Sequence, residues 1–173
     1  MIVIHPSAEQ KAEAAKDARA MGSLPNSVTY GRGNLIGMLA EIVAADWLKA
    51  PRVRPPVYSH DIEFNGRTID VKAKRCSSLP LPEYSASVFA KNGKHGIKAD
   101  ILLFTRVTDD CDTVYLLGWL TTRQFARRAE FVKQGTRDGG FIHRADGFHV
   151  PIKRLRSMEE LAALACAEPL LNP

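Results

Sequence analysis

Two stretches of the chain are apolar at almost every position and have the length of β-strands. They are residues Ile101 to Val107 and Thr113 to Leu120, and the segment between them, TDDCD, is typical of a turn. Strands that are apolar on both faces usually lie at the centre of a sheet covered by helices. The pattern therefore predicts two buried central strands.

A third stretch, from Val57 to Arg75, alternates between apolar and polar residues around Asn65-Gly66. Asn-Gly favours a two-residue hairpin turn because both turn positions adopt positive φ. The resulting register pairs Phe64 with Arg67, Glu63 with Thr68, Ile62 with Ile69 and Asp61 with Asp70. One face then carries Ile62, Phe64, Ile69, Val71 and Ala73, which we assign to the core, and the other carries Asp61, Asp70, Lys72 and Lys74.

Two helices are expected before the hairpin. Ser7 and Gln10 form a capping-box pattern, and Gly22 marks the end of an alanine-rich helix. After a loop over residues 22–33, the segment Asn34 to Leu48 is apolar nearly all round, which is typical of a buried helix. Glu41 is the only charged residue between Gly33 and Ala45. A buried carboxylate needs a partner or a proton, so Glu41 either pairs with a core lysine or arginine or serves as a metal ligand or catalytic group.

The remaining elements are shorter. We expect a linker over residues 50–56, a strand from Tyr84 to Ala90, a flexible basic loop from Lys91 to Lys98, a helix from Thr121 to Val132, a loop from Gln134 to Gly147, a strand from Phe148 to Ile152 and a last helix from Ser157 to about Ala167. This order predicts an α/β fold with a mixed central β-sheet flanked by helices.

The composition is that of an ordinary globular protein, with 45% apolar and 25% charged residues over 173 residues. This length suggests a single domain, 1–173, in which residues 1–29 form an N-terminal helix and loop, 30–122 the core and 123–173 the C-terminal helices and strand. The net charge of +5 permits a nucleic-acid partner. Cys76, Cys111 and Cys166 lie far apart, which argues for a reducing compartment. Without an apolar run that could span a bilayer, we expect a cytoplasmic protein with no membrane partner.

The hairpin register carries chemical information because it places Asp61 opposite Asp70. Like charges at opposed positions destabilise a sheet, so solvent, a raised pKa, a basic neighbour or a bound cation must offset the repulsion. Lys72 lies one step along the same face. Two carboxylates beside a lysine can hold Mg²⁺ against a phosphate. A solvated hairpin face with mixed charges is the alternative.

These residues together resemble the PD-(D/E)XK nuclease superfamily, which has the restriction-endonuclease-like fold. The glutamate of the first core helix matches Glu41, the first aspartate matches Asp61, and the (Asp/Glu)-x-Lys triplet matches Asp70, Val71 and Lys72. His60 stands where the family name has a proline. The order of elements agrees with the family from about Tyr30 to Thr122.

The resemblance implies a metal-dependent nuclease that hydrolyses phosphodiester bonds, with DNA as the expected partner and Mg²⁺ as the cofactor, replaceable by Mn²⁺. Asp61, Asp70 and the Val71 carbonyl would hold one ion, while Glu41 would hold a second ion or orient a ligand water. Lys72 would position the attacking water or stabilise the transition state. Glu63 is a spare ligand candidate. Phosphate contacts are expected from Lys74, Arg75, Lys91, Lys94 and Lys98.

Two other functions remain open at this point. The chain could be a catalytically inactive nucleic-acid-binding module on the same fold. It could also be an assembly protein in which Glu41, Asp61, Asp70 and Lys72 form an internal salt-bridge cluster. The alanine-rich first helix would suit assembly, and the sequence leaves open whether the chain forms a homodimer.

Overall fold

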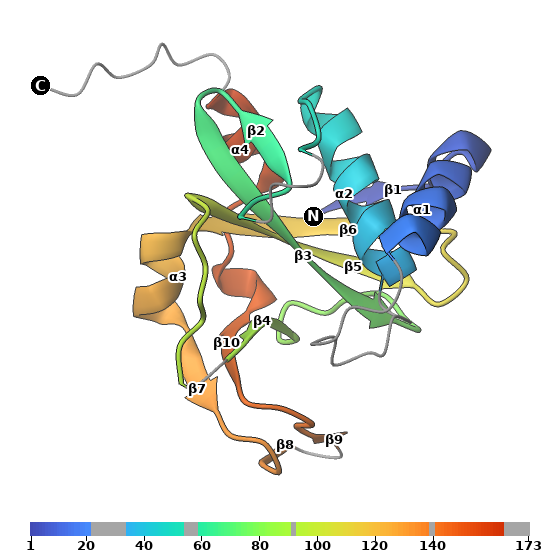
Figure 1. Cartoon of the computed structure of the whole chain (residues 1–173). Coiled ribbons are helices and arrows are strands. Elements are labelled where there is room, and N and C mark those ends of the chain that lie inside the picture. Colours follow the sequence, from blue (N-terminus) through green and yellow to red (C-terminus); the bar gives the residue numbers. More distant parts are fainter. Residues whose placement is uncertain (22–33, 54–58, 91–92, 139–140, 165–173) are drawn as a thin grey trace, which may run out of the picture.

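A computed structural model describes residues 1–21, 34–53, 59–90, 93–138 and 141–164 (Figure 1). The fold is α/β, built around a five-stranded mixed sheet. In spatial order its strands are β1 (Ile2–Ile4), β6 (Val114–Thr121), β5 (Ile101–Thr108), β3 (Arg67–Cys76) and β2 (Ile62–Phe64). β3 and β5 run parallel, and the other neighbours are antiparallel. The mixed sheet with buried β5 and β6 confirms the expected fold class at this level.

A second, smaller sheet packs on one face of the large sheet. It consists of β4 (Ser85–Phe89), β10 (Gly147–Pro151) and β7 (Glu130–Val132), and a separate hairpin pairs β8 (Arg137–Asp138) with β9 (Phe141–Ile142). The helices are α1 (Ala8–Met21), α2 (Asn34–Leu48), α3 (Thr122–Arg128) and α4 (Met158–Ala163), with a 3-10 turn, η1 (Ile152–Arg154). In Figure 1, α1 and α2 lie on the opposite side of the large sheet from β4 and β10.

Each face of the large sheet therefore has its own apolar core. α2 packs with the apolar face of the β2–β3 hairpin, where Ile62 and Ile69 are fully buried. On the other face, Leu102 and Phe104 of β5 pack against the small sheet and Phe125 of α3. Because residues of a strand alternate between faces, β5 contributes to both cores. β3 contributes apolar residues to the α2 side and polar residues to the side of the small sheet.

Local signals in the sequence locate several elements correctly. The hairpin has the predicted register from Phe64–Arg67 to Ile62–Ile69, with Asn65 and Gly66 at φ of 50° and 72°. α1 begins with the predicted capping box, in which the Gln10 amide donates to Ser7 Oγ and the Ser7 amide donates to Gln10 Oε1. Both boundaries of α2 agree with the prediction. Thr121 and Ser157 cap α3 and α4 as expected.

Two expectations in the second half are wrong, and two features were not predicted. α3 ends at Arg128 rather than Val132, because Ala129 turns extended and residues 130–132 pair with β10. There, Phe131 packs against Phe148 with ring centroids 5.4 Å apart. The segment from Gln134 to Gly147 is not only a loop, since it contains the β8–β9 hairpin. β1 was not predicted, and β4 with β10 belongs to a separate sheet.

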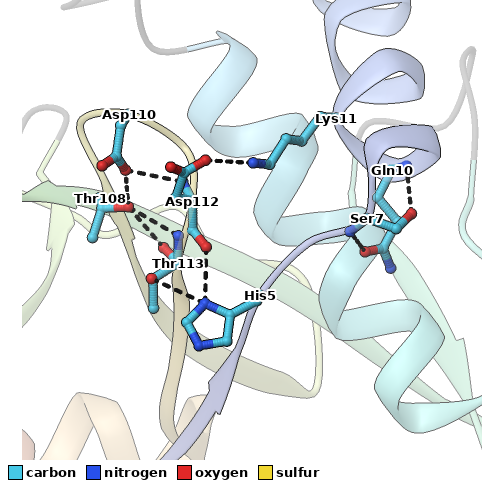
Figure 2. Close-up of polar contacts among 8 residues, drawn as sticks. All are labelled: His5, Ser7, Gln10, Lys11, Thr108, Asp110, Asp112 and Thr113. Atoms are coloured by element: carbon cyan, nitrogen blue, oxygen red, sulfur yellow. Dashed lines mark hydrogen bonds and ion pairs between the residues drawn. The ribbon is translucent and has the colours of Figure 1, made fainter.

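Polar contacts fix the N-terminal strand to the turn between β5 and β6 (Figure 2). His5 Nδ1 lies 3.1 Å from the Asp112 carbonyl oxygen, and Lys11 of α1 pairs with the Asp112 carboxylate. The Asp110 carboxylate accepts from Thr108 Oγ1 and from the Asp112 amide, which holds the turn in shape. These contacts explain how a strand of three residues is retained at the edge of the sheet.

Some expected segments lie outside the described residues. These are the loop over residues 22–33, the second half of the linker, Lys91, and the chain beyond residue 164. None of the described helices is long and apolar enough to cross a membrane.

Gly118 of β6 provides a test of how the C-terminal segment packs on the sheet. Its φ is +145°, and an added Cβ would collide with the Arg156 carbonyl oxygen and lie 2.8 Å from Leu155 Cβ. We expect Gly118→Ala to lower stability by about 2 kcal/mol or more in urea unfolding. Gly37→Ala is the control, because no atom lies within 4 Å of its added Cβ and alanine favours a helix by about 1 kcal/mol. Equal stability of the two variants would contradict this packing.

Candidate active site

The candidate site lies where β2 stops pairing with β3. β2 has only three residues, and its ladder ends at Ile62–Ile69. Beyond it, the Asp61 amide donates to the Ile69 carbonyl at 2.8 Å, while Asp61 Oδ2 accepts a 2.7 Å hydrogen bond from the Val71 amide. The Asp61 carboxylate thus takes the place of a strand partner at the edge of β3. This contact fixes Asp61 beside Asp70.

Asp70 and Lys72 share one face of β3, as the alternation predicts. Lys72 Nζ lies 2.7 Å from Asp70 Oδ2, and the two side chains are 33% and 17% exposed. The Asp70 carboxylate also lies close enough to Asp61 for its negative charge to raise the pKa of Asp61. The structure therefore brings Asp61, Asp70 and Lys72 together. Val71 lies between them in sequence, with its side chain on the core face.

Glu41 adds a third carboxylate from α2, which packs against the hairpin. No hydrogen bond or ion pair joins its side chain to any residue in the described part of the chain. Burial and the negative charge of Asp61 raise the pKa of Glu41 to about 8, although Arg52 and Lys72 oppose the shift. Burial and the charge of Asp70 likewise raise the pKa of Asp61 to about 6. The positive charges of Arg52 and Lys72 are therefore too weak or too distant to keep all three carboxylates ionised at neutral pH.

Arg52 is a residue of this region that the sequence did not reveal. We assigned it to a linker, but Arg52 forms a β-bridge with Ile62, and its guanidinium pairs with Asp17 of α1. Its side chain is only 11% exposed, and its Nη1 is buried without a hydrogen-bond partner among the described residues. The arginine therefore joins α1 to the hairpin and acts on Glu41 only at longer range. Arg52 stands among prolines in the sequence, and that pattern does not indicate a buried arginine beside the hairpin.

The donor set suits Mg²⁺ in its chemistry, since it consists of carboxylate oxygens with a main-chain carbonyl nearby. Among the described residues, however, no three His, Cys, Asp or Glu side chains are already arranged to hold a metal ion. One Asp61 oxygen accepts from the Val71 amide and one Asp70 oxygen pairs with Lys72. An ion that used Asp70 Oδ2 would compete with Lys72 for that oxygen.

The other predicted residues are distributed more widely. Lys74 lies on the same face of β3 as Lys72, two residues further on. Arg75 is exposed and lies 3.7 Å from Asp109, and Lys94 and Lys98 are exposed after β4. Glu63 is 64% exposed and contacts His60 at 3.4 Å. Glu63 therefore does not join the three carboxylates, although it lies on β2, next to Asp61 in the same hairpin.

A cavity of about 170 Å³ lies away from these carboxylates. Ser85, Glu130, Val132, Asp138, His143, His149, Pro151 and Arg154 line it. None of Glu41, Asp61, Asp70 or Lys72 contributes to this lining. A site that acts on a polymer has to be open at the surface, so the position of this small cavity does not decide where chemistry occurs.

Comparisons with known proteins give no further guidance. The sequence matches no protein-family model, and a search of curated proteins finds no match. The functional interpretation therefore depends on the geometry and charge of the carboxylate cluster, defined as Glu41, Asp61 and Asp70.

The raised pKa of Glu41 predicts how stability changes with pH. Between its unfolded pKa of 4.5 and its folded pKa of about 8, the folded protein retains a proton that the unfolded chain has released. The parent therefore loses stability as pH rises through this range, and Glu41→Gln avoids the loss. We expect Glu41→Gln to exceed the parent at pH 8 by more than about 1.4 kcal/mol, the value of one pKa unit. The two proteins should be similar at pH 4.5.

Urea unfolding in EDTA at several pH values measures this difference. Glu63→Gln is the matched control, because it removes an exposed carboxylate from the hairpin against which α2 packs. A gain for Glu41→Gln that is the same at pH 4.5 and pH 8 would show that Glu41 is not held in a charge-poor environment.

Proposed function

We propose that this protein is a Mg²⁺-dependent nuclease with a restriction-endonuclease-like fold, which hydrolyses phosphodiester bonds in nucleic acid, with DNA as the expected substrate. One observation carries the proposal. Asp61 and Asp70 lie side by side where β2 stops pairing with β3, next to Lys72, and Glu41 of α2 lies within electrostatic range of both. The fold assignment is supported by the hairpin that enters a mixed sheet and by the buried helix α2.

The charge of the cluster favours a cation as its partner. The raised pKa values of Glu41 and Asp61 show that the neighbouring bases do not fully compensate their charges, so Glu41 keeps a proton at neutral pH unless a cation replaces it. Carboxylates alone would repel a phosphate, whereas a divalent ion attracts both. Oxygen donors favour Mg²⁺, and Mn²⁺ should substitute for it.

The residues have distinct roles in this proposal. Asp61 and Asp70 would hold the ion with the help of the Val71 carbonyl, and Glu41 would hold a second ion or orient a ligand water. When bound, the metal supplies an activated water and screens the charge of the scissile phosphate. Lys72 lies 2.7 Å from Asp70. Once released from that carboxylate, its ammonium group would position the attacking water or stabilise negative charge in the transition state.

The contacts also weigh against the two alternatives. A structural salt-bridge cluster would pair each acid with a base, but only Asp70 has such a partner within the described cluster. A buried unpaired carboxylate destabilises a protein, so a purely structural role leaves Glu41 unexplained. A binding module without catalysis would gain nothing from three carboxylates that repel phosphates.

Substitution of Asp70 and Lys72 tests the proposal. We expect Asp70→Asn and Lys72→Ala each to reduce Mg²⁺-dependent cleavage by about 100-fold or more, because each removes a metal ligand or a charge that stabilises the transition state. Both side chains lie on the polar face of β3, away from the α2 core. The melting temperature in EDTA should therefore stay level or rise for Asp70→Asn, where a repulsion with Asp61 is relieved. It should fall slightly for Lys72→Ala, which leaves Asp70 without its ion pair but keeps the fold.

The assay should use plasmid DNA, single-stranded DNA and RNA with Mg²⁺, Mn²⁺ or EDTA, with Glu63→Gln as the control variant. Parental cleavage rates in both substituted proteins would show that the site is assigned wrongly. Unfolding of both variants would instead favour the structural salt-bridge cluster.

A further inference from the structure

Lys74 and Arg106 place two positive charges opposite each other in the large sheet. The parallel register pairs Asp70 with Leu102, Lys72 with Phe104 and Lys74 with Arg106. All six side chains are on the face towards the small sheet, and Arg106 is the only charged residue of β5. Like charges at opposed positions destabilise a sheet unless something offsets them.

Arg106 is held in a fixed orientation by uncharged partners. Its Nη1 donates to the Arg75 carbonyl at 3.4 Å and its Nη2 to the Ser85 carbonyl at 3.1 Å. Its guanidinium carbon lies 5.8 Å from the centre of the Tyr84 ring. A guanidinium has five N–H donors, so these two hydrogen bonds leave donors available. No carboxylate of the described residues forms an ion pair with Arg106.

Lys74 has even fewer partners. No hydrogen bond or ion pair joins its ammonium group to any residue in the described ranges. Burial and the charge of Arg106 lower the pKa of Lys74 to about 8. Burial lowers the pKa of His149 to about 4, and the charge of Lys74 is the second largest cause of this shift. Lys74 and Arg106 therefore form a partly buried positive patch that lacks an anion among the described residues.

The position of the patch relative to Lys72 indicates which anion it binds. Two residues along a strand span about 6.6 Å, which is close to the step between neighbouring phosphates of one nucleic-acid strand. We propose that Lys74 and Arg106 form a phosphate subsite that holds the phosphate next to the scissile one. This subsite rests on the proposed nuclease function and would fix the direction in which the substrate strand crosses β3.

Lys74→Met is the informative variant, because Arg106 also ties β3 to β4 and its loss could unfold the protein. Methionine keeps an unbranched chain while removing a desolvated charge. We expect the melting temperature of Lys74→Met in EDTA to equal or exceed that of the parent. A clearly lower value would show that Lys74 is already paired and would overturn the subsite. Lys16→Met, on the exposed surface of α1, controls for the lost net charge.

The first experiment measures the melting temperature as pyrophosphate is added, in EDTA at constant ionic strength and without metal or DNA. We expect pyrophosphate to stabilise the parent, Lys16→Met and Asp70→Asn, and its apparent affinity to fall by about tenfold or more in Lys74→Met. The same affinity in parent and Lys74→Met would overturn the subsite. Because this readout needs no cleavage, it can succeed even if the nuclease proposal fails.

The second measurement is binding to duplex DNA with Ca²⁺ over a range of salt concentrations. Loss of one phosphate contact should reduce the slope of log K against log salt by about 0.9 in Lys74→Met and leave it unchanged in Lys16→Met. If the parent cleaves DNA and Lys74→Met has the parental slope, the subsite is wrong and the nuclease stands. If the parent neither binds nor cleaves nucleic acid but shows Lys74-dependent pyrophosphate binding, the nuclease is wrong and the anion site stands.

Discussion

Electrostatic repulsion among three carboxylates is the constraint on which the candidate site depends. It arises because β2 ends after three residues, so that Asp61 rather than a backbone carbonyl accepts the Val71 amide. A longer β2 would have satisfied this amide within the ladder and left Asp61 free to turn towards solvent. The short strand instead holds Asp61 against Asp70 and within reach of Glu41. Burial of all three carboxylates in ionised form is unfavourable, so a proton on Glu41 or a bound cation has to offset the charge.

The elements that could be predicted are those fixed by neighbours in sequence. Asn65-Gly66 determines its own turn, and Ser7 and Gln10 cap their own helix. Those that could not be predicted depend on partners far along the chain. β1 has three residues and pairs with β6 more than 100 positions later. β7 continues directly from α3 and becomes a strand only because β10 is available for pairing. No local pattern contains that information.

The same distinction applies to the candidate site. The two-residue turn and the alternation of side chains predict that Asp61 and Asp70 lie close together, but the regular pairing ends at Ile62–Ile69. Asp61 instead reaches Asp70 through an irregular contact with the Val71 amide, which the sequence does not indicate. The approach of Glu41 requires α2 to cross the hairpin, which the buried character of α2 only suggests. Arg52 and Arg106 could not be assigned at all. Arg52 depends on a bridge to Ile62, and Arg106 acquires its role from the parallel register with Lys74.

β3 connects these features because it is bordered by a different core on each face. Its apolar residues pack towards α2, while its polar residues face the small sheet in the order Asp70, Lys72 and Lys74. Charge on this face therefore changes from negative, at the open edge beside Asp61, to positive beside Arg106. A single extended strand can display such a gradient because alternate side chains point the same way at intervals of about 6.6 Å. An anionic polymer bridged by a cation at Asp70 would meet attraction further along β3, so both ends of the gradient would favour one alignment of such a polymer.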